Sequence, residues 1–398
     1  MASMAAERAD QRHTGSAAPR VLMVTPHYFP HQGGVETHTY EVARRLVDMH
    51  TRPTVLTIDM SGALPAREVI EGVEVRRIRA WPKGRDYYYT PEIGRIIATE
   101  PWDIVHSQGI NTLTAPLAMY GAWHRRIPYV VTFHTGGNRS SLRNAARDTQ
   151  WRTLGPLLRR AARLIPVSRF ERARFARLLG LPVERFTLIR NGAQLPTLPD
   201  DLPAREGGPL IVSVGRLERY KGHHRSIAAL PFVRAAHPDA RLLILGAGPY
   251  EAELHRQIAA LNLKEAVTIR SIPAHERREL AMAVAGASVV ALLSDYEAHP
   301  LAVLEALALG RPVLVADTSG LSELAEDGLV RAIPADSAPG QVAAALLDQI
   351  REPLLPTNFR LPTWDTCAME VYGLYQEIWG GRDAAPVSLR PQATHVAR

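Results

Sequence analysis

The stretch that decides the fold runs from residue 294 to residue 310 and spells Ser-Asp-Tyr-Glu-Ala-His-Pro-Leu-Ala-Val-Leu-Glu-Ala-Leu-Ala-Leu-Gly. An apolar run at residues 287–293 predicts a buried parallel strand, and Pro300 suits the first position of a helix because its fixed φ and missing N–H cost nothing there. Glu297 then lies on the loop and Glu305 in the second helical turn. Carboxylates at the carboxyl edge of an α/β sheet can accept hydrogen bonds from sugar or ribose hydroxyls. The pattern predicts a polyol site; two solvated acids beside a helix are the alternative interpretation.

A second charged motif stands earlier in the chain, where a predicted strand at residues 210–214 runs into Gly-Arg-Leu-Glu-Arg-Tyr-Lys-Gly. Arg216 and Lys221 of this loop place two positive charges where a diphosphate would lie. Lys221 is one of three lysines among 47 basic residues, so a lysine rather than an arginine is kept at this position. The turn at residues 317–320, after another predicted strand, can offer further backbone N–H groups to a phosphate.

Length and composition favour two globular domains. The 398 residues are too many for one ordinary core and fit two domains of roughly 150–200 residues. The chain is 46% apolar and 22% charged, as soluble proteins are, and no apolar stretch approaches the ~20 residues of a membrane span. Cys367 is the only cysteine, which excludes an intramolecular disulfide and favours a cytoplasmic location. Residues 1–19 lack the apolar core of a signal peptide and are predicted to be a disordered tail.

The alternation of apolar runs and helical patterns predicts an α/β fold with doubly wound parallel sheets. We expect a first domain at residues 20–194, a linker rich in proline and glycine at 195–209, and a second domain at 210–362. In the first domain the predicted strands are 21–25, 54–58, 73–78, 104–107, 129–133, 164–167 and 187–189, and the predicted helices are 35–49, 111–123, 149–162 and 170–179.

Two loops of the first domain are candidates for ligand contact. Gly33 and Gly34 precede a helix, where paired glycines let the backbone approach a ligand and free N–H groups attract anions. A plain tight turn explains them equally well. His134 follows a predicted strand and opens a segment with two glycines, where its imidazole could bond a sugar hydroxyl or a developing charge, or could simply satisfy its own loop.

The net charge of +7 comes largely from arginines in the first half of the chain, twelve of them at residues 139–185. Part of this stretch has the pattern of an amphipathic basic helix, which could contact an anionic membrane at its inner face or hold an anionic acceptor. A solvated face is the alternative. No zinc-finger spacing or RNP-like motif is present, so we expect no nucleic acid partner. Residues 86–89, Asp-Tyr-Tyr-Tyr, could stack on sugar rings.

Taken in chain order, these motifs resemble those of the retaining glycosyltransferases of family 4, over about residues 20–380. The resemblance implies the GT-B architecture: two Rossmann-like doubly wound domains that face each other across a cleft, with a C-terminal helix at 363–380 that returns to the N-terminal domain and a flexible tail at 381–398. It also implies transfer of a hexosyl unit from a UDP- or GDP-linked sugar to a hydroxyl acceptor with retention, as in polysaccharide, glycolipid or natural-product glycoside biosynthesis.

The resemblance implies a role for each motif. Arg216 and Lys221 would neutralise the donor diphosphate, and Glu297 would hold hydroxyls of the transferred sugar. Glu305 would hold the ribose, and His134 would touch the sugar near the reacting carbon. The implied catalytic residues are His134, Arg216, Lys221 and Glu297; the implied donor-binding residues also include Gly33, Gly34, His299, Pro300, Leu301 and Glu305, with Ser271 and Ile272 near the nucleobase.

Departures from the family pattern leave the substrates open. The sequence Glu297-Ala298-His299-Pro300 stands where the family often has Glu-Gly-Phe-Gly, and Ser271 replaces a frequent glycine near the nucleobase. No Asp-x-Asp motif occurs, so we expect neither a metal ion nor another cofactor. Two other functions remain open: a nucleotide-sugar epimerase on the same fold, which would need an acid and a base flanking the sugar, and a non-catalytic nucleotide-sugar binding protein.

Overall fold

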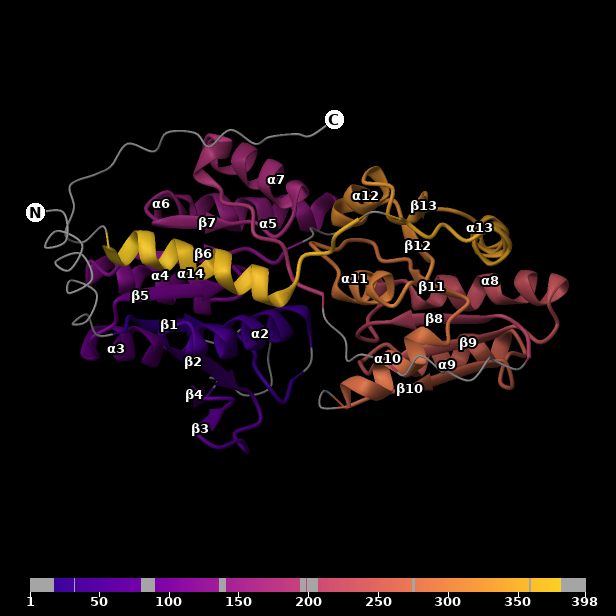
Figure 1. The fold of residues 1–398 in the computed structure, drawn as a ribbon, viewed down its shortest axis with the longest axis horizontal. Coiled ribbons are helices and arrows are strands. Elements are labelled where there is room, and N and C mark those ends of the chain that lie inside the picture. The colour runs from indigo at the N-terminus through magenta and orange to yellow at the C-terminus, as the bar shows by residue number, and fades with distance from the viewer. Residues whose placement is uncertain are drawn as a thin grey trace, which may run out of the picture.

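The chain folds into two α/β lobes, each built on one sheet with helices on its faces (Figure 1). The structure is a computed structural model that describes residues 18–31, 33–79, 90–135, 141–193, 198, 207–273, 276–357 and 359–380, without the side chains of 141–146. Most of the predicted linker and tails, residues 86–89, and the glycines after His134 lie outside these ranges. The predicted architecture of two Rossmann-like sheets is confirmed.

The first lobe contains a seven-stranded sheet in the order β3-β4-β2-β1-β5-β6-β7, parallel except for β3. Its strands are β1 (Arg20–Val24), β2 (Arg52–Asp59), β3 (Arg67–Ile70), β4 (Val73–Arg79), β5 (Ile104–Gln108), β6 (Tyr129–Thr132) and β7 (Arg163–Ile165). Its helices are α2 (Gly34–Asp48), α3 (Glu92–Thr99), α4 (Thr114–His124), α5 (Ser141–Thr153), α6 (Gly155–Leu158), α7 (Arg169–Leu179) and the 3-10 helix η1 (Val183–Arg185). The Val-Leu-Met-Val run of β1 is buried throughout, as a central strand covered on both faces must be.

The second lobe contains six parallel strands in the order β10-β9-β8-β11-β12-β13. They are β8 (Leu210–Val214), β9 (Arg241–Leu245), β10 (Val267–Arg270), β11 (Val289–Leu292), β12 (Val313–Ala316) and β13 (Arg331–Ile333). The helices are η2 (Arg219–Lys221), α8 (His223–Ala236), α9 (Glu251–Ala260), α10 (Arg277–Ala285), α11 (Leu301–Ala308), α12 (Ser319–Glu326) and α13 (Pro339–Arg351). β8 pairs with β11, so the strand order reverses between them and the loops at their carboxyl ends meet, as ligand-binding loops do in such sheets.

The last helix, α14 (Trp364–Gly380), returns to the first lobe and packs against α2 (Figure 1). One face of α14, with Trp364 and Tyr375, is buried in the same core as β1. At its start the chain touches Gly192, where a Cβ would overlap the backbone at Trp364, and the N–H of Ala193 donates to the carbonyl of Pro362 at 2.8 Å. The two backbone segments between the lobes therefore run side by side. No helix in the described ranges is both long and apolar enough to cross a membrane.

Some local predictions are wrong. Residues 187–189 form no strand; an isolated bridge joins Leu164 to Phe186 instead. The helix predicted at 149–162 is two helices, α5 and α6, because the chain turns before the Gly-Pro pair that begins α6. Pro300 is the N-cap of α11, with extended φ and ψ, and not its first residue. The edge strand β3, the helix α3 and the strand β13 were not predicted.

Candidate active site

Two loops of the second lobe bring Lys221 against Glu297 at the carboxyl ends of β8 and β11. Lys221 Nζ donates to Glu297 Oε1 at 2.7 Å, and Ser294 Oγ donates to the same oxygen at 2.8 Å. Both side chains of the pair are largely buried, which strengthens their attraction relative to an exposed pair. Glu297 Oε2 has no hydrogen-bond partner among the described residues. The Lys221 ammonium group and the Glu297 carboxylate, which has unused lone pairs on Oε2, thus lie side by side at the carboxyl edge of the sheet.

Backbone contacts hold these two loops together. Gly222 has φ 76°, and a Cβ there would overlap the carbonyl oxygen of Leu293, so glycine is required by both conformation and space. The N–H of Asp295 donates to the carbonyl of Tyr220 at 2.7 Å, and the rings of Tyr220 and Tyr296 stack with centroids 4.4 Å apart. The Lys221–Glu297 geometry is therefore fixed by the fold and does not depend on the two side chains alone.

The turn at residues 317–320 supports the Glu297 loop from the other side. Ser319 Oγ donates to the carbonyl of Glu297 and accepts from its N–H, both at 2.8 Å, and the N–H of Gly320 donates to the same carbonyl at 2.9 Å. The sequence suggests that this turn offers N–H groups to a phosphate. In the structure the N–H groups of Asp317, Thr318 and Gly320 are bonded within the chain and the turn holds the loop, so among the four N–H groups of the turn only that of Ser319 has no acceptor in the described chain.

Arg216 lies in the same loop as Lys221 but has a different partner. Its Nη2 is 2.6 Å from Glu218 Oε1, and 57% of the Arg216 side chain is exposed. It also lies near Glu36, in the first turn of α2: burial raises the pKa of Glu36, and the charge of Arg216 opposes that rise. The exposure of Arg216 leaves its guanidinium accessible to a ligand.

Glu305 is buried in the second turn of α11, as predicted, but its partner is Arg277 at the start of α10. Burial raises the pKa of Glu305, and the adjacent guanidinium of Arg277 opposes the rise. Glu305 Oε2 has no hydrogen-bond partner among the described residues. The sequence predicts that Glu297 and Glu305 form one polyol site; in the structure no hydrogen bond joins them, and each is paired with a cation of its own.

The two glycines at the start of α2 differ in what surrounds them. A Cβ on Gly33, the N-cap, would overlap the carboxylate of Glu36, which is the far end of a flexible side chain and can move aside. A Cβ on Gly34 would meet no atom of the described chain within 4 Å. No contact within the described chain explains Gly34.

His134 follows β6 in a left-handed conformation with φ 54°. Its Nε2 donates to Gln108 Oε1 at 2.9 Å, and its ring packs edge-on against His38 with centroids 4.5 Å apart. Burial lowers the pKa of His134 well below its ordinary value, and the nearby rings of His38 and His106 lower it further. The ring is therefore neutral at pH 7 with its proton on Nε2, which leaves Nδ1 as the acceptor.

A buried network supports Gln108 from behind. Its amide nitrogen lies 3.4 Å from both ring nitrogens of His106. His106 in turn bonds the Tyr375 hydroxyl through Nδ1 at 2.6 Å and Thr132 Oγ1 through Nε2 at 2.8 Å. Burial lowers the pKa of His106 to about 3. The network connects α14 to the loop that carries His134, and no local pattern in the sequence indicates it.

Two family models match the chain in tandem. The model described as "Glycosyltransferase Family 4" matches residues 32–195, and the model described as "Glycosyl transferases group 1" matches residues 196–360. The two matches adjoin between the lobes and together cover most of the chain. The chain belongs to the family 4 glycosyltransferases.

Known proteins agree with this assignment. The chain is 29% identical to glycogen synthase of Mycobacterium tuberculosis over 84% of this chain and 86% of that protein. It is 27% identical to D-inositol 3-phosphate glycosyltransferase of Xylanimonas cellulosilytica over 93% of this chain and 99% of that protein. The fold matches sucrose-phosphate synthase from Thermosynechococcus elongatus with a TM-score of 0.74 and 20% identity, over 91% of this chain and 100% of that chain.

In this glycosyltransferase the loop before α11 is tied to the first lobe by Asn191. Its Nδ2 donates to the carbonyl of His299 at 3.0 Å, and its Oδ1 accepts from His38 Nδ1 at 3.0 Å. Burial lowers the pKa of His299 to about 3 and that of His38 to about 4. The His299 ring is buried between the lobes, and Leu301 packs against the cores of both. Sequence reasoning missed Asn191, although it ends the predicted first domain.

A second tie between the lobes is Glu323 of α12, which the sequence analysis also missed. Its Oε2 accepts from the backbone N–H of Arg169 at 2.7 Å and of Phe170 at 3.3 Å, the first residues of α7. Its Oε1 accepts from Arg190 Nη2 at 2.8 Å. The N-terminus of a first-lobe helix is thus capped by a carboxylate of the second lobe.

The residues predicted near the nucleobase follow β10. Ser271 is exposed, whereas Ile272 is buried in the core of the second lobe, and a nucleobase contact at either residue stays a prediction. Within the described ranges no group of three or more histidine, cysteine, aspartate or glutamate residues could hold a metal ion. Independence from metal stays a prediction.

From residue 141 on, the arginine-rich stretch at residues 139–185 spans α5, α6, β7, α7 and η1, and the helix predicted within it at residues 149–162 is divided between α5 and α6. Several of its arginines bind within the chain: Arg159 Nη2 donates to the carbonyl of Leu179 at 2.6 Å, and Arg174 Nη2 is 2.9 Å from Asp148. These bonds reduce the cationic surface that this stretch offers to a membrane. Membrane contact stays a prediction.

Proposed function

We propose that this glycosyltransferase moves a hexosyl unit from a UDP- or GDP-linked sugar to a hydroxyl acceptor, with retention of the anomeric configuration and without a metal ion. The observation that carries the proposal is the Lys221–Glu297 pair, 2.7 Å apart at the carboxyl edge of the second sheet with Glu297 Oε2 unpaired among the described residues. The ammonium group suits a diphosphate, and the remaining oxygen suits a neighbouring sugar hydroxyl.

Two further side chains fit the ends of such a donor. Arg216 is exposed and bound to Glu218 of its own loop, so it can turn to the diphosphate at the cost of one surface ion pair. Glu305 is held by Arg277 through one oxygen and keeps Oε2 for a ribose hydroxyl. In this interpretation Arg277 orients the Glu305 carboxylate and keeps it charged.

The reaction then needs positive charge and one neutral imidazole. As the bond between the anomeric carbon and the phosphate oxygen breaks, negative charge grows on the phosphate, where Lys221 and Arg216 stabilise it. His134 accepts a hydrogen bond from a sugar hydroxyl through Nδ1 and holds the sugar. The acceptor oxygen bonds to the anomeric carbon on the face that the phosphate leaves, and a phosphate oxygen takes the acceptor's proton.

A thermal-shift screen with UDP, GDP and their hexose conjugates tests the donor class. A ligand that binds only the folded chain stabilises it by about 2.7 kcal/mol at 100 times its Kd. We expect one nucleotide series to raise the melting temperature and the other not; no shift with any nucleotide would overturn the proposal.

The stereochemistry needs a separate assay. NMR of the product's anomeric linkage should show the configuration of the donor, and an inverted linkage would refute retention. A product in which the sugar stays on the nucleotide with one centre inverted would favour the epimerase.

A further inference from the structure

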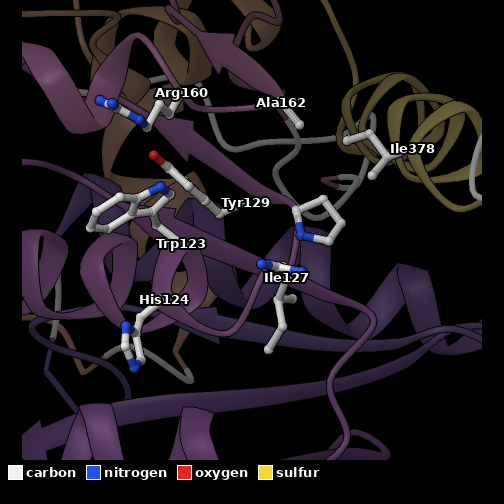
Figure 2. A pocket seen from close by; sticks show the side chains of 9 residues that line it. Trp123, His124, Ile127, Tyr129, Arg160, Ala162 and Ile378 are labelled. Atoms are coloured by element: carbon white, nitrogen blue, oxygen red, sulfur yellow. The ribbon is translucent and has the colours of Figure 1, made fainter. Parts of the chain in front are cut away.

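A hollow on the first lobe lies away from the predicted donor site. It has a volume of about 630 Å³ and is lined by Trp123, His124, Arg126, Ile127, Pro128, Tyr129, Arg160, Ala162 and Ile378 (Figure 2). These residues come from the end of α4, the start of β6, the segment before β7, and α14. His134 follows the opposite end of β6, about 15 Å away at ~3.3 Å per residue. A ligand in this hollow is therefore not the donor in the cleft.

The charge of the lining is of one sign. Arg126, Arg160 and a histidine line the hollow, and no carboxylate of the described residues does. The Arg126 side chain is exposed and has no hydrogen bond or ion pair with the described residues. Arg126 also has φ 57° just after α4, at a helix end where glycine adopts this conformation more easily. An unpaired guanidinium at the mouth of a hollow is suited to a carboxylate or phosphate, which it can bind through two parallel hydrogen bonds.

The other part of the lining is aromatic. Trp123 is 45% exposed, and its neighbour Tyr120 is 54% exposed, with ring centroids 5.8 Å apart. The Arg160 guanidinium lies 5.4 Å from the centre of the Trp123 ring. In Figure 2, Trp123 and Tyr129 flank one side of the hollow, and Ile378 of α14 lies across from them. An exposed indole beside cations offers a flat apolar face to a ring that also carries negative charge.

We propose that this hollow binds an anionic sugar: a sugar ring that packs on Trp123 and carries a phosphate or carboxylate bound by Arg126 and Arg160. The volume lies within the roughly 300–1,000 Å³ typical of small-molecule sites. The lining is concave, and Arg160 lies over the indole of Trp123. Such a surface suits a compact ligand better than a flat bilayer, because binding to a bilayer requires apolar side chains that protrude from the protein. The ligand is either a free sugar phosphate or one unit of an acidic glycan, and the proposal is independent of the donor class.

Isothermal titration calorimetry on the full chain tests the site. The probes are glucose 6-phosphate, trigalacturonate, neutral maltotriose and inorganic phosphate, measured on wild type and on Trp123→Ala and Arg126→Gln. We expect one molecule of an anionic sugar to bind per chain, and each variant to weaken binding about tenfold or more while the chain stays folded. Equal binding of glucose 6-phosphate and trigalacturonate would identify a single-unit site, and tighter trigalacturonate binding would identify a glycan segment; both support the proposal.

Matched controls keep the proposal falsifiable. Arg125→Gln alters the exposed arginine next to Arg126 that does not line the hollow, and Lys221→Ala alters the predicted donor site; neither should weaken the anionic sugar. Equal losses in Arg125→Gln and Arg126→Gln, loss in Lys221→Ala, or equal binding of maltotriose or phosphate would overturn the proposal. So would Trp123-dependent binding to vesicles of phosphatidylcholine and phosphatidylglycerol without binding of either anionic sugar. Loss of transfer in Lys221→Ala with the anionic sugar still bound separates this site from the donor site.

Discussion

Glu323→Gln should loosen the contact between the two lobes. Glu323 is 4% exposed, and its two oxygens accept from the first backbone N–H groups of α7 and from Arg190. Glutamine has the same size and keeps one carbonyl oxygen as a hydrogen-bond acceptor, but it lacks the negative charge and the second acceptor oxygen. A hydrogen bond to a charged group contributes about 1.5–3 kcal/mol, and a helix N-cap about 1 kcal/mol. Glutamine keeps part of the hydrogen bonding and part of the helix capping. We therefore expect the free energy that favours contact between the lobes to fall by about 1.5–3 kcal/mol, which lowers the ratio of joined to separated lobes roughly ten- to 150-fold.

Small-angle X-ray scattering and amide hydrogen exchange measure this change. We expect a larger radius of gyration, faster exchange at Arg169 and Phe170, and a lower kcat/KM, because the proposed transfer uses residues of both lobes. Glu326→Gln is the matched control: it lies on the same helix, is 71% exposed, and approaches Arg169 only to 3.7 Å. If Glu323→Gln keeps the wild-type radius, exchange and kcat/KM, Glu323 does not hold the lobes together.

Three other changes test single parts of the site. Gly34→Ala should keep the stability of the fold or raise it by about 0.5–1 kcal/mol, because the position is helical and a Cβ there has room. The same change should raise the donor Kd, measured by calorimetry, at least about tenfold; an unchanged Kd would place the donor elsewhere. Gln108→Glu should raise the pKa of His134 and move the acid limb of the kcat/KM profile to higher pH by about one unit or more, whereas an unmoved profile would exclude this role for Gln108. The pKa values of His38 and His299 are lowered on folding to about 4 and about 3. As the pH falls, the unfolded chain therefore takes up protons on these rings before the folded chain does. The contribution of the two neutral rings to folding stability is fully present above pH ~6.5, and toward pH 4 it falls by about 1.4 kcal/mol per pH unit for each ring. Urea midpoints should show a shallower fall in His38→Gln, and the same slope in both proteins would contradict a neutral buried His38.

The sequence predicts those parts of the fold that depend on local patterns. The strand predicted at 210–214 has the bounds observed for β8, and α14 begins within one residue of its predicted start. Both could be predicted because burial on one or both faces of an element determines the spacing of its apolar residues. The edge strand β3 was missed because its alternating, largely exposed residues resemble a loop. The apolar residues at 187–189 predict a strand, but only Ile189 among them is buried, and the N–H groups of Thr187 and Ile189 bond to the chain at Leu164 and Pro166 without a full ladder.

The site shows the same division between local and long-range information. Lys221 and Glu297 could be predicted because each lies in a loop whose strand and helix are visible in the sequence, and the order of the sheet then brings the loops together. The partners that organise the rest are distant in sequence: Arg277 lies 28 residues from Glu305, Gln108 lies 26 from His134, and Glu323 lies 154 from Arg169. No local pattern marks such pairs, because they exist only once the sheets and lobes are packed.

The most direct test is calorimetric titration of UDP and GDP into wild type, Lys221→Ala and Lys264→Ala. Lys264 is exposed, precedes the amino end of β10 whereas the site lies at the carboxyl ends of the strands, and is identical in chemistry, so it controls for the loss of one lysine. We predict that one of the two nucleotides binds wild type and Lys264→Ala equally and binds Lys221→Ala at least about tenfold more weakly, as expected when a charged partner of a diphosphate is removed. Equal affinity in all three proteins would contradict a diphosphate site at the Lys221–Glu297 pair.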